Sequence, residues 1–179
     1  MKSYSTLVNE LLDDEEDLLL RLCPAEPGHA ESIRSIREAT DEELTGGAVM
    51  ANADYPRLIR AGLFYAHDAL GESHRIVQEM SSAPASYWHG MMHRREGDFD
   101  NARYWFRRTG RLALFPEMHA EAARISPLMA RQLDWDPYAL VGQCEQARFG
   151  GDVAQKELVA LQRIEFWVMF NHLWRGAFT

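Results

Sequence analysis

The sequence predicts one all-α domain that spans residues 1–179. Apolar side chains recur every three to four residues along most of the chain, and glycine or proline breaks divide it into segments of helical length. The strict alternation that marks a half-buried strand hardly appears. A length of 179 residues with 46% hydrophobic content is typical of one globular domain with its own core. We therefore expect seven to nine helices, packed as hairpins.

The first helices are predicted from an apolar stripe and a capping motif. A first helix should carry four leucines on one stripe before Cys23–Gly28 breaks it, and these are Leu7, Leu11, Leu18 and Leu22. A short helix is expected over residues 30–38. Thr40 and Glu43 then have the spacing of a capping box, in which the hydroxyl and the carboxylate each accept a backbone N–H. The Gly-Gly pair that follows should end this helix.

Turn residues divide the middle of the chain. Asp54 should cap a helix that tolerates Pro56 in its first turn, and Gly71 should separate it from a helix over residues 72–80. After a break at positions 82–84, two more helices are expected. The first covers residues 85–96 and ends at Gly97, and the second starts at Asp98 or Asp100, stops at Gly110 and buries Ala102, Trp105 and Phe106.

The last third of the chain is predicted from cap-plus-proline starts. Ser126-Pro127 and Asp136-Pro137 each have the form of a helix N-terminus. A final helix should begin at Gly150-Gly151-Asp152. Its aromatic face is expected to dock into the core and consists of Trp167, Phe170 and Trp174.

Charge and cysteine content limit the classes of function. The net charge is −8, with Asp13–Asp17 as the densest acidic run, so we expect no nucleic acid or membrane partner. No stretch of 18 apolar residues occurs, and the N-terminus lacks the apolar core of a signal peptide. Cys23 and Cys144 match no metal or redox spacing and suit a reducing compartment. The sequence predicts a cytoplasmic protein and makes no prediction of its oligomeric state.

Two resemblances fall on the same segment. Gly90, Gly97-Asp98-Phe99, Ala102 and Phe106 resemble one tetratricopeptide unit, with a weaker echo at Leu70, Ser73 and Val77. Because a solenoid needs about three repeats, this resemblance implies helix hairpins, with a tetratricopeptide-like core over residues 57–110, more than a peptide-binding array. The whole string Ser86–Arg108, together with Ser73-His74 and Trp135-Asp136-Pro137, resembles the signature of a family of helical proteins with no established activity.

A histidine and glutamate pattern suggests metal binding. His89 and His93 are four residues apart and Glu96 is three further, so all three project from one face of a helix. Imidazoles and carboxylates at these intervals are workable ligands for a divalent metal ion. His74, on the preceding helix, and His172, on the last helix, are further candidates. The alternative is a structural network in which these groups hydrogen-bond to each other and to backbone.

An arginine-rich segment suggests a different ligand. Arg94, Arg95 and Arg107, together with the two histidines of the same helix, would suit a small carboxylate or phosphate. The walls of such a pocket would be formed by Tyr87, Trp88, Tyr104 and Trp105. The alternative for these aromatic residues is packing in the hydrophobic core. The alternative for the arginines is a solvated basic face.

The sequence thus leaves three hypotheses open. The first is binding of a small anionic molecule, with or without catalysis, in a pocket whose candidate residues are His74, His89, His93, Arg94, Glu96, Asn101 and Arg107. The second is a metal-dependent enzyme that uses His89, His93 and Glu96. The third is an interaction module that has no chemistry.

Overall fold

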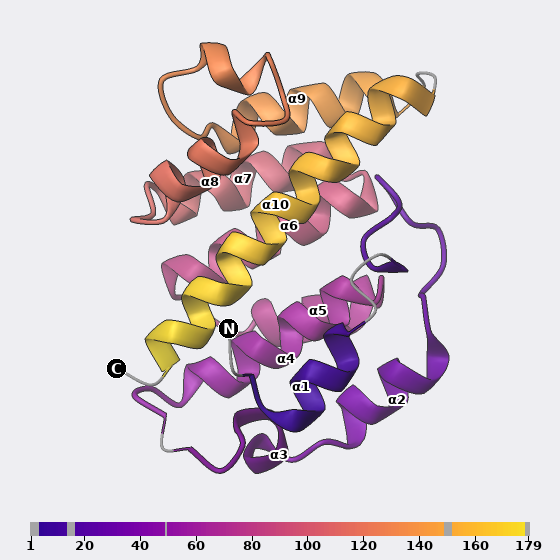
Figure 1. The fold of residues 1–179 in the computed structure, drawn as a ribbon, viewed down its shortest axis with the longest axis vertical. Helices are drawn as coiled ribbons and strands as arrows, with labels where there is room; N and C mark the ends of the chain where they lie inside the picture. Colours follow the sequence, from indigo (N-terminus) through magenta and orange to yellow (C-terminus); the bar gives the residue numbers. More distant parts are fainter. Residues whose placement is uncertain (1–3, 14–16, 49, 149–151, 178–179) are drawn as a thin grey trace.

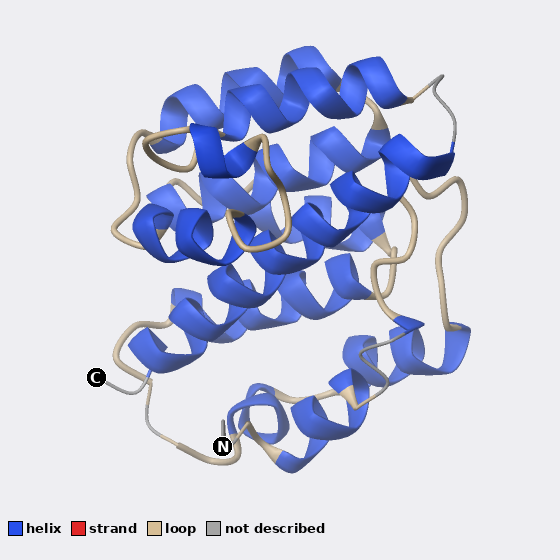
Figure 2. Cartoon of the chain, turned by 45° about the horizontal axis from the view of Figure 1, so that its top comes forward, coloured by secondary structure: helices blue, strands red, loops and turns tan. Residues whose placement is uncertain are grey.

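The computed structural model describes residues 4–13, 17–48, 50–148 and 152–177. All regular secondary structure in these residues is helical. No strand occurs among them (Figure 2). The elements are α1 (Thr6–Leu12), α2 (Ala30–Glu38), α3 (Asp41–Thr45), α4 (Asp54–Ala66), α5 (Leu70–Val77), α6 (Ala83–Glu96), α7 (Phe99–Thr109), α8 (Phe115–Ala122), the 3-10 turn η2 (Met129–Arg131), α9 (Pro137–Ala147) and α10 (Asp152–Ala177). Of the described helices, none is long and apolar enough to cross a membrane.

The long C-terminal helix joins the two ends of the molecule. α10 runs diagonally across the fold and packs against α4, α8 and α9 (Figure 1). The consecutive helices α4, α5, α6 and α7 pack on one another in sequence order, and α1, α2 and α3 lie at the end opposite α8 and α9. The all-α fold that the sequence predicts is therefore confirmed.

Two glycines let the central helices approach closely. A Cβ atom at Gly90 of α6 would lie 2.7 Å from the ring of Phe106 on α7. One at Gly62 of α4 would lie 2.9 Å from the ring of Phe170 on α10. The α6–α7 hairpin therefore needs a residue without a side chain at position 90. The closer likeness of residues 57–110 to tetratricopeptide repeats stays a prediction.

Local signals placed several helix ends correctly. α2 covers residues 30–38 as predicted, and Thr40 and Glu43 form both halves of the capping box. Gly97 ends α6 with a φ of 79°, a left-handed conformation that glycine adopts without steric cost. Asp98 caps α7, since its side chain accepts the N–H of Asn101. Asp136 caps α9 in the same way.

The first helix is shorter than predicted. α1 ends at Leu12, whereas the leucine stripe predicts a helix that continues to Leu22. Leu19 has a φ of 58°, which a right-handed helix does not contain. Leu18 and Leu22 are nevertheless buried, so the loop after α1 carries them into the core. The acidic run ahead of them includes residues 14–16, which lie outside the described residues.

The boundary between α4 and α5 also differs from the prediction. Gly71 lies inside α5 and does not separate the two helices. The chain turns instead at Asp68, whose φ is 58° and whose carboxylate accepts hydrogen bonds from Arg21 and Arg95. Aspartate tolerates the left-handed region better than most residues, and the two arginines hold it there.

Several smaller predictions are corrected in the same way. Asp54 is the first residue of α4 and not its cap, and its N–H donates to the side chain of Asn52. Ser126 starts no α-helix; its hydroxyl accepts the N–H of Met129, the first residue of the short turn η2. Trp105 is half-buried and does not belong to the core. On α10, Phe170 and Trp174 are buried as predicted, Trp167 is partly buried, and the glycines predicted to precede this helix lie outside the described residues.

Candidate functional site

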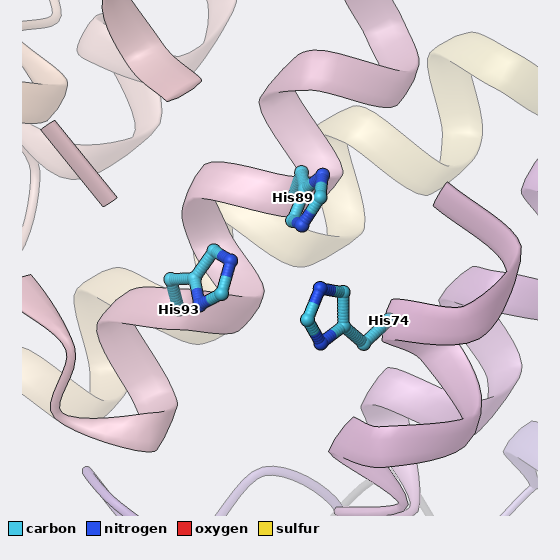
Figure 3. A group of neighbouring side chains, drawn as sticks. All are labelled: His74, His89 and His93. Atoms are coloured by element: carbon cyan, nitrogen blue, oxygen red, sulfur yellow. The ribbon is translucent and has the colours of Figure 1, made fainter. Parts of the chain in front are cut away.

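Three histidines from two helices converge on one point. His89 and His93 lie on successive turns of α6, and His74 reaches them from α5 (Figure 3). One ring nitrogen from each histidine can be chosen so that all three atoms lie within 4.8 Å of one another. The four-residue spacing aligns the first two on one face of α6, and the packing of α5 on α6 supplies the third.

His89 is buried, and no described residue offers its ring a hydrogen bond. Its side chain is 2% exposed, and its ring stacks on Trp105 with centroids 3.8 Å apart and an interplanar angle of 18°. Neither ring nitrogen has a hydrogen-bond partner among the described residues. Buried polar atoms usually have a partner, so an imidazole with neither nitrogen satisfied calls for a specific explanation. Burial, followed by the nearby rings of His93 and His74, lowers the pKa of His89 to about 3.

His93 is held from both sides. Its Nδ1 lies 3.0 Å from a carboxylate oxygen of Glu96, and its Nε2 lies 3.0 Å from the amide nitrogen of Asn101. The tautomer that satisfies both contacts has Nδ1–H donating to Glu96 and Nε2 accepting from Asn101. A carboxylate on one imidazole nitrogen is the arrangement that orients histidine ligands in metal sites.

His74 completes the cluster from the more exposed side. Its ring centroid lies 4.7 Å from that of His89 and 4.9 Å from that of His93. Burial lowers the pKa of His74 first, and the neighbouring His93 lowers it further, against an opposing effect of Glu96. Three imidazoles this close cannot all carry a proton without strong repulsion, so the cluster favours rings with free lone pairs.

The cluster is close to the dimensions of a three-histidine metal site. Zinc–nitrogen bonds of about 2.0–2.1 Å in a tetrahedral site place two ligand nitrogens about 3.4 Å apart. The three nitrogens here lie within 4.8 Å, so small side-chain rotations would bring them to that spacing. His93 would exchange its contact with Asn101 for the metal and keep its contact with Glu96.

The arginines of the same helix lie elsewhere. Arg94 is fully buried and forms a two-pronged ion pair with Glu165 of α10, in which its Nη1 donates to Oε1 at 3.2 Å. Glu165 also accepts from the hydroxyl of Tyr87 at 2.7 Å. Arg95, also fully buried, donates to the carbonyl of Tyr65 and to Asp68. Because successive helix residues point about 100° apart, neither guanidinium joins the imidazoles.

The remaining candidates are divided in the same way. Glu96 and Asn101 contact the histidine cluster, as described above, but Arg107 is exposed on α7 and pairs with no described residue. His172 is exposed on α10 and is not one of the three clustered histidines. Of the predicted aromatic walls, Tyr87 and Trp88 are core residues and Tyr104 is largely exposed.

The stacking of Trp105 on His89 is a contact that the sequence did not predict. The sequence offered Trp105 as a pocket wall or as a core residue, without a partner. Only the packing of α7 against α6 shows that its ring covers the buried imidazole.

Comparisons with known proteins add no assignment: no protein-family model, curated protein or solved structure matches the chain. The resemblance of residues 86–108 to a family signature therefore stays a prediction, and hypotheses about function rest on the geometry.

Proposed function

We propose that this protein binds a divalent transition-metal ion through His74, His89 and His93. The observation that carries the proposal is the buried imidazole of His89, whose two nitrogens have no partner among the described residues. A metal ion bound to one of them would supply the missing interaction. Imidazole is a good ligand for zinc, copper, iron and nickel, so the ligand chemistry fits a late first-row metal.

The depressed pKa values favour the same function. A histidine must be neutral to donate its lone pair to a metal. Burial and mutual repulsion lower the pKa of both His89 and His74, so protons compete less for these two rings at neutral pH. In this proposal Glu96 orients His93 from behind, and His74 takes the ligand place that the sequence analysis assigned to Glu96.

Three protein ligands leave a coordination position for water or substrate. Catalytic zinc sites have this composition, whereas structural sites usually have four protein ligands. The proposal therefore extends to a metal-dependent enzyme as the next hypothesis. The tetratricopeptide-like interaction module remains a competing hypothesis, and it predicts no bound metal. A cytoplasmic location also stays a proposal, supported by the two free cysteines.

Elemental analysis tests the proposal. The untagged protein is purified without chelator, and its metal content is compared with that of His89→Leu, His74→Ala and the matched control His172→Ala. We expect about one metal per chain in the wild type and in the His172→Ala control, and little in the two cluster variants. Circular dichroism checks that each variant is folded.

A second measurement tests metal rebinding, because a bound metal could be lost during purification. Chelator-treated protein is titrated with Co²⁺, whose visible absorption reports coordination by nitrogen ligands, and with Zn²⁺ in a thermal unfolding assay. Zinc at about 100 times its dissociation constant should add about 2.7 kcal/mol to the free energy of unfolding. The proposal fails if the wild type neither retains nor rebinds metal, or if His89→Leu binds it as well as the wild type.

A further inference from the structure

A second candidate site lies next to the histidine cluster but does not include its rings. It is a cavity of about 720 Å³, within the range of small-molecule sites. We call it the loop cavity, because the loop after α1 (purple in Figure 1) forms one wall. Its lining consists of Leu20–Ala25, Glu96, Arg148, Gln155, Lys156 and Val159.

Among the described residues of this lining, cationic side chains outnumber acidic ones. Arg21, Arg148 and Lys156 face one described carboxylate, that of Glu96, in a chain whose net charge is −8. Arg21 is committed to the carboxylate of Asp68. Lys156 is exposed and forms no hydrogen bond or ion pair with the described residues. A locally positive cavity in an acidic protein attracts anions selectively.

The same cavity has an apolar side. Leu20 is 51% exposed although the neighbouring Leu19 is 2% exposed. The left-handed backbone at Leu19, with a φ of 58°, turns its own side chain inward and leaves Leu20 at the cavity. Val159 of α10 and Pro24 also belong to the lining. An exposed leucine beside the exposed ammonium group of Lys156 suits a ligand with both an apolar body and an anionic head.

We propose that the loop cavity binds a small organic anion, whose carboxylate or phosphate pairs with Arg148 and Lys156 and whose hydrocarbon part packs against Leu20 and Val159. Arg148 also donates to the carbonyl of Gly97 at 3.4 Å, so the end of α6 would orient it. This site needs no metal and goes beyond the function proposed above. It differs from the anion pocket expected from sequence, because its cations come from the loop, the end of α9 and the start of α10.

A thiol in the lining provides a direct reporter. Cys23 is half-buried in the wall of the loop cavity, whereas Cys144, the other cysteine, is fully buried. Alkylation of the native protein by iodoacetamide therefore measures access to Cys23. A ligand in the loop cavity should slow this reaction.

The probes are octanoate, octyl phosphate, octylamine and inorganic phosphate, used on chelator-treated wild-type protein. Binding is measured by isothermal titration calorimetry and by the rate of Cys23 alkylation, followed by mass spectrometry. We expect octanoate or octyl phosphate to bind and protect Cys23, and octylamine to do neither. The stronger of the two anions identifies the head group, and binding should weaken as salt is raised.

Matched variants test the role of charge. Lys156→Gln should weaken binding of the better anion about tenfold, the size of effect for one charge-assisted contact worth about 1.4 kcal/mol. Arg175→Gln, an exposed arginine further along the same helix, makes the same change in net charge and should leave affinity within about twofold. An Arg148→Gln/Lys156→Gln double variant should not bind detectably.

Several results would overturn this proposal. The proposal is wrong if neither octyl anion binds or protects Cys23, or if octylamine binds as well as they do. It is also wrong if inorganic phosphate binds but the octyl anions do not, or if Lys156→Gln binds the better anion as tightly as the wild type. Since the protein is metal-free in these assays, they are independent of whether the histidine cluster binds metal.

Discussion

Replacement of His89 by leucine should remove a large part of the acid sensitivity of this protein. In the folded state, burial against Trp105 and the two neighbouring imidazoles lowers the pKa of His89 to about 3, from an ordinary value near 6.5. Between these two values the unfolded chain binds a proton at this position and the folded chain does not. The stability contributed by the neutral ring is therefore complete above about pH 6.5 and is lost as pH falls toward 3.

The size of this loss follows from the two pKa values. A proton that binds the unfolded chain with a pKa of about 6.5 and the folded chain with one of about 3 costs about 2 kcal/mol of unfolding free energy at pH 5. Between pH 7.5 and pH 5.0, His89→Leu should lose about 2 kcal/mol less stability than the wild type. His67 and His74 also have lowered pKa values. Because both residues are present in the wild type and in the variant, their contributions to the difference in stability largely cancel.

Urea unfolding of chelator-treated protein at the two pH values measures the effect. The matched control is His172→Leu, which removes an exposed histidine and should follow the wild type. If His89→Leu and the wild type lose stability in parallel, then His89 takes up a proton in the folded state without cost. The fold would then not hold the ring of His89 neutral, and the proposed metal site would lose one of its supports.

Two further predictions concern packing and buried charge. Gly90→Ala should destabilise the protein by about 1–3 kcal/mol, because the added methyl would lie 2.7 Å from the ring of Phe106, whereas Gly71→Ala, with open space around it, should be neutral or stabilising. Similar melting temperatures for the two variants would show that α6 and α7 do not pack this closely. Glu165→Gln should cost about 3–5 kcal/mol, because it leaves the buried guanidinium of Arg94 without its counter-charge. An Arg94→Met/Glu165→Leu double variant should cost less than the summed costs of Arg94→Met and Glu165→Leu, and simple additivity in chemical unfolding would contradict a coupled ion pair.

Features that depend on a few neighbouring residues could be predicted from the sequence. The capping box at Thr40 and the stops at Gly97 and Gly110 are set by side chains that bond backbone three residues away, or by glycine conformations. The common face of His89 and His93 follows from the helix period alone. The all-α class follows from the same periodicity, summed over the chain.

The leucine stripe shows where such local reasoning fails. Its spacing fits a helix through Leu22, yet Leu18 is buried in a loop after α1. Burial of an apolar side chain in the core does not require that its backbone be helical. The turn at Asp68 depends likewise on Arg21 and Arg95, which lie 47 and 27 residues away. Tertiary contacts of this kind override local propensity.

The order of residues is enough to show that α6 carries histidines, arginines and a glutamate in one short stretch. Which of these side chains act together depends on how the helices pack. α6 is buried on nearly every side, so each consecutive residue faces a different neighbour. His89 and His93 meet His74 on α5, while Arg94 turns toward Glu165, 71 residues away on α10. A buried charge must find its partner wherever the fold places one, and local spacing does not contain that information.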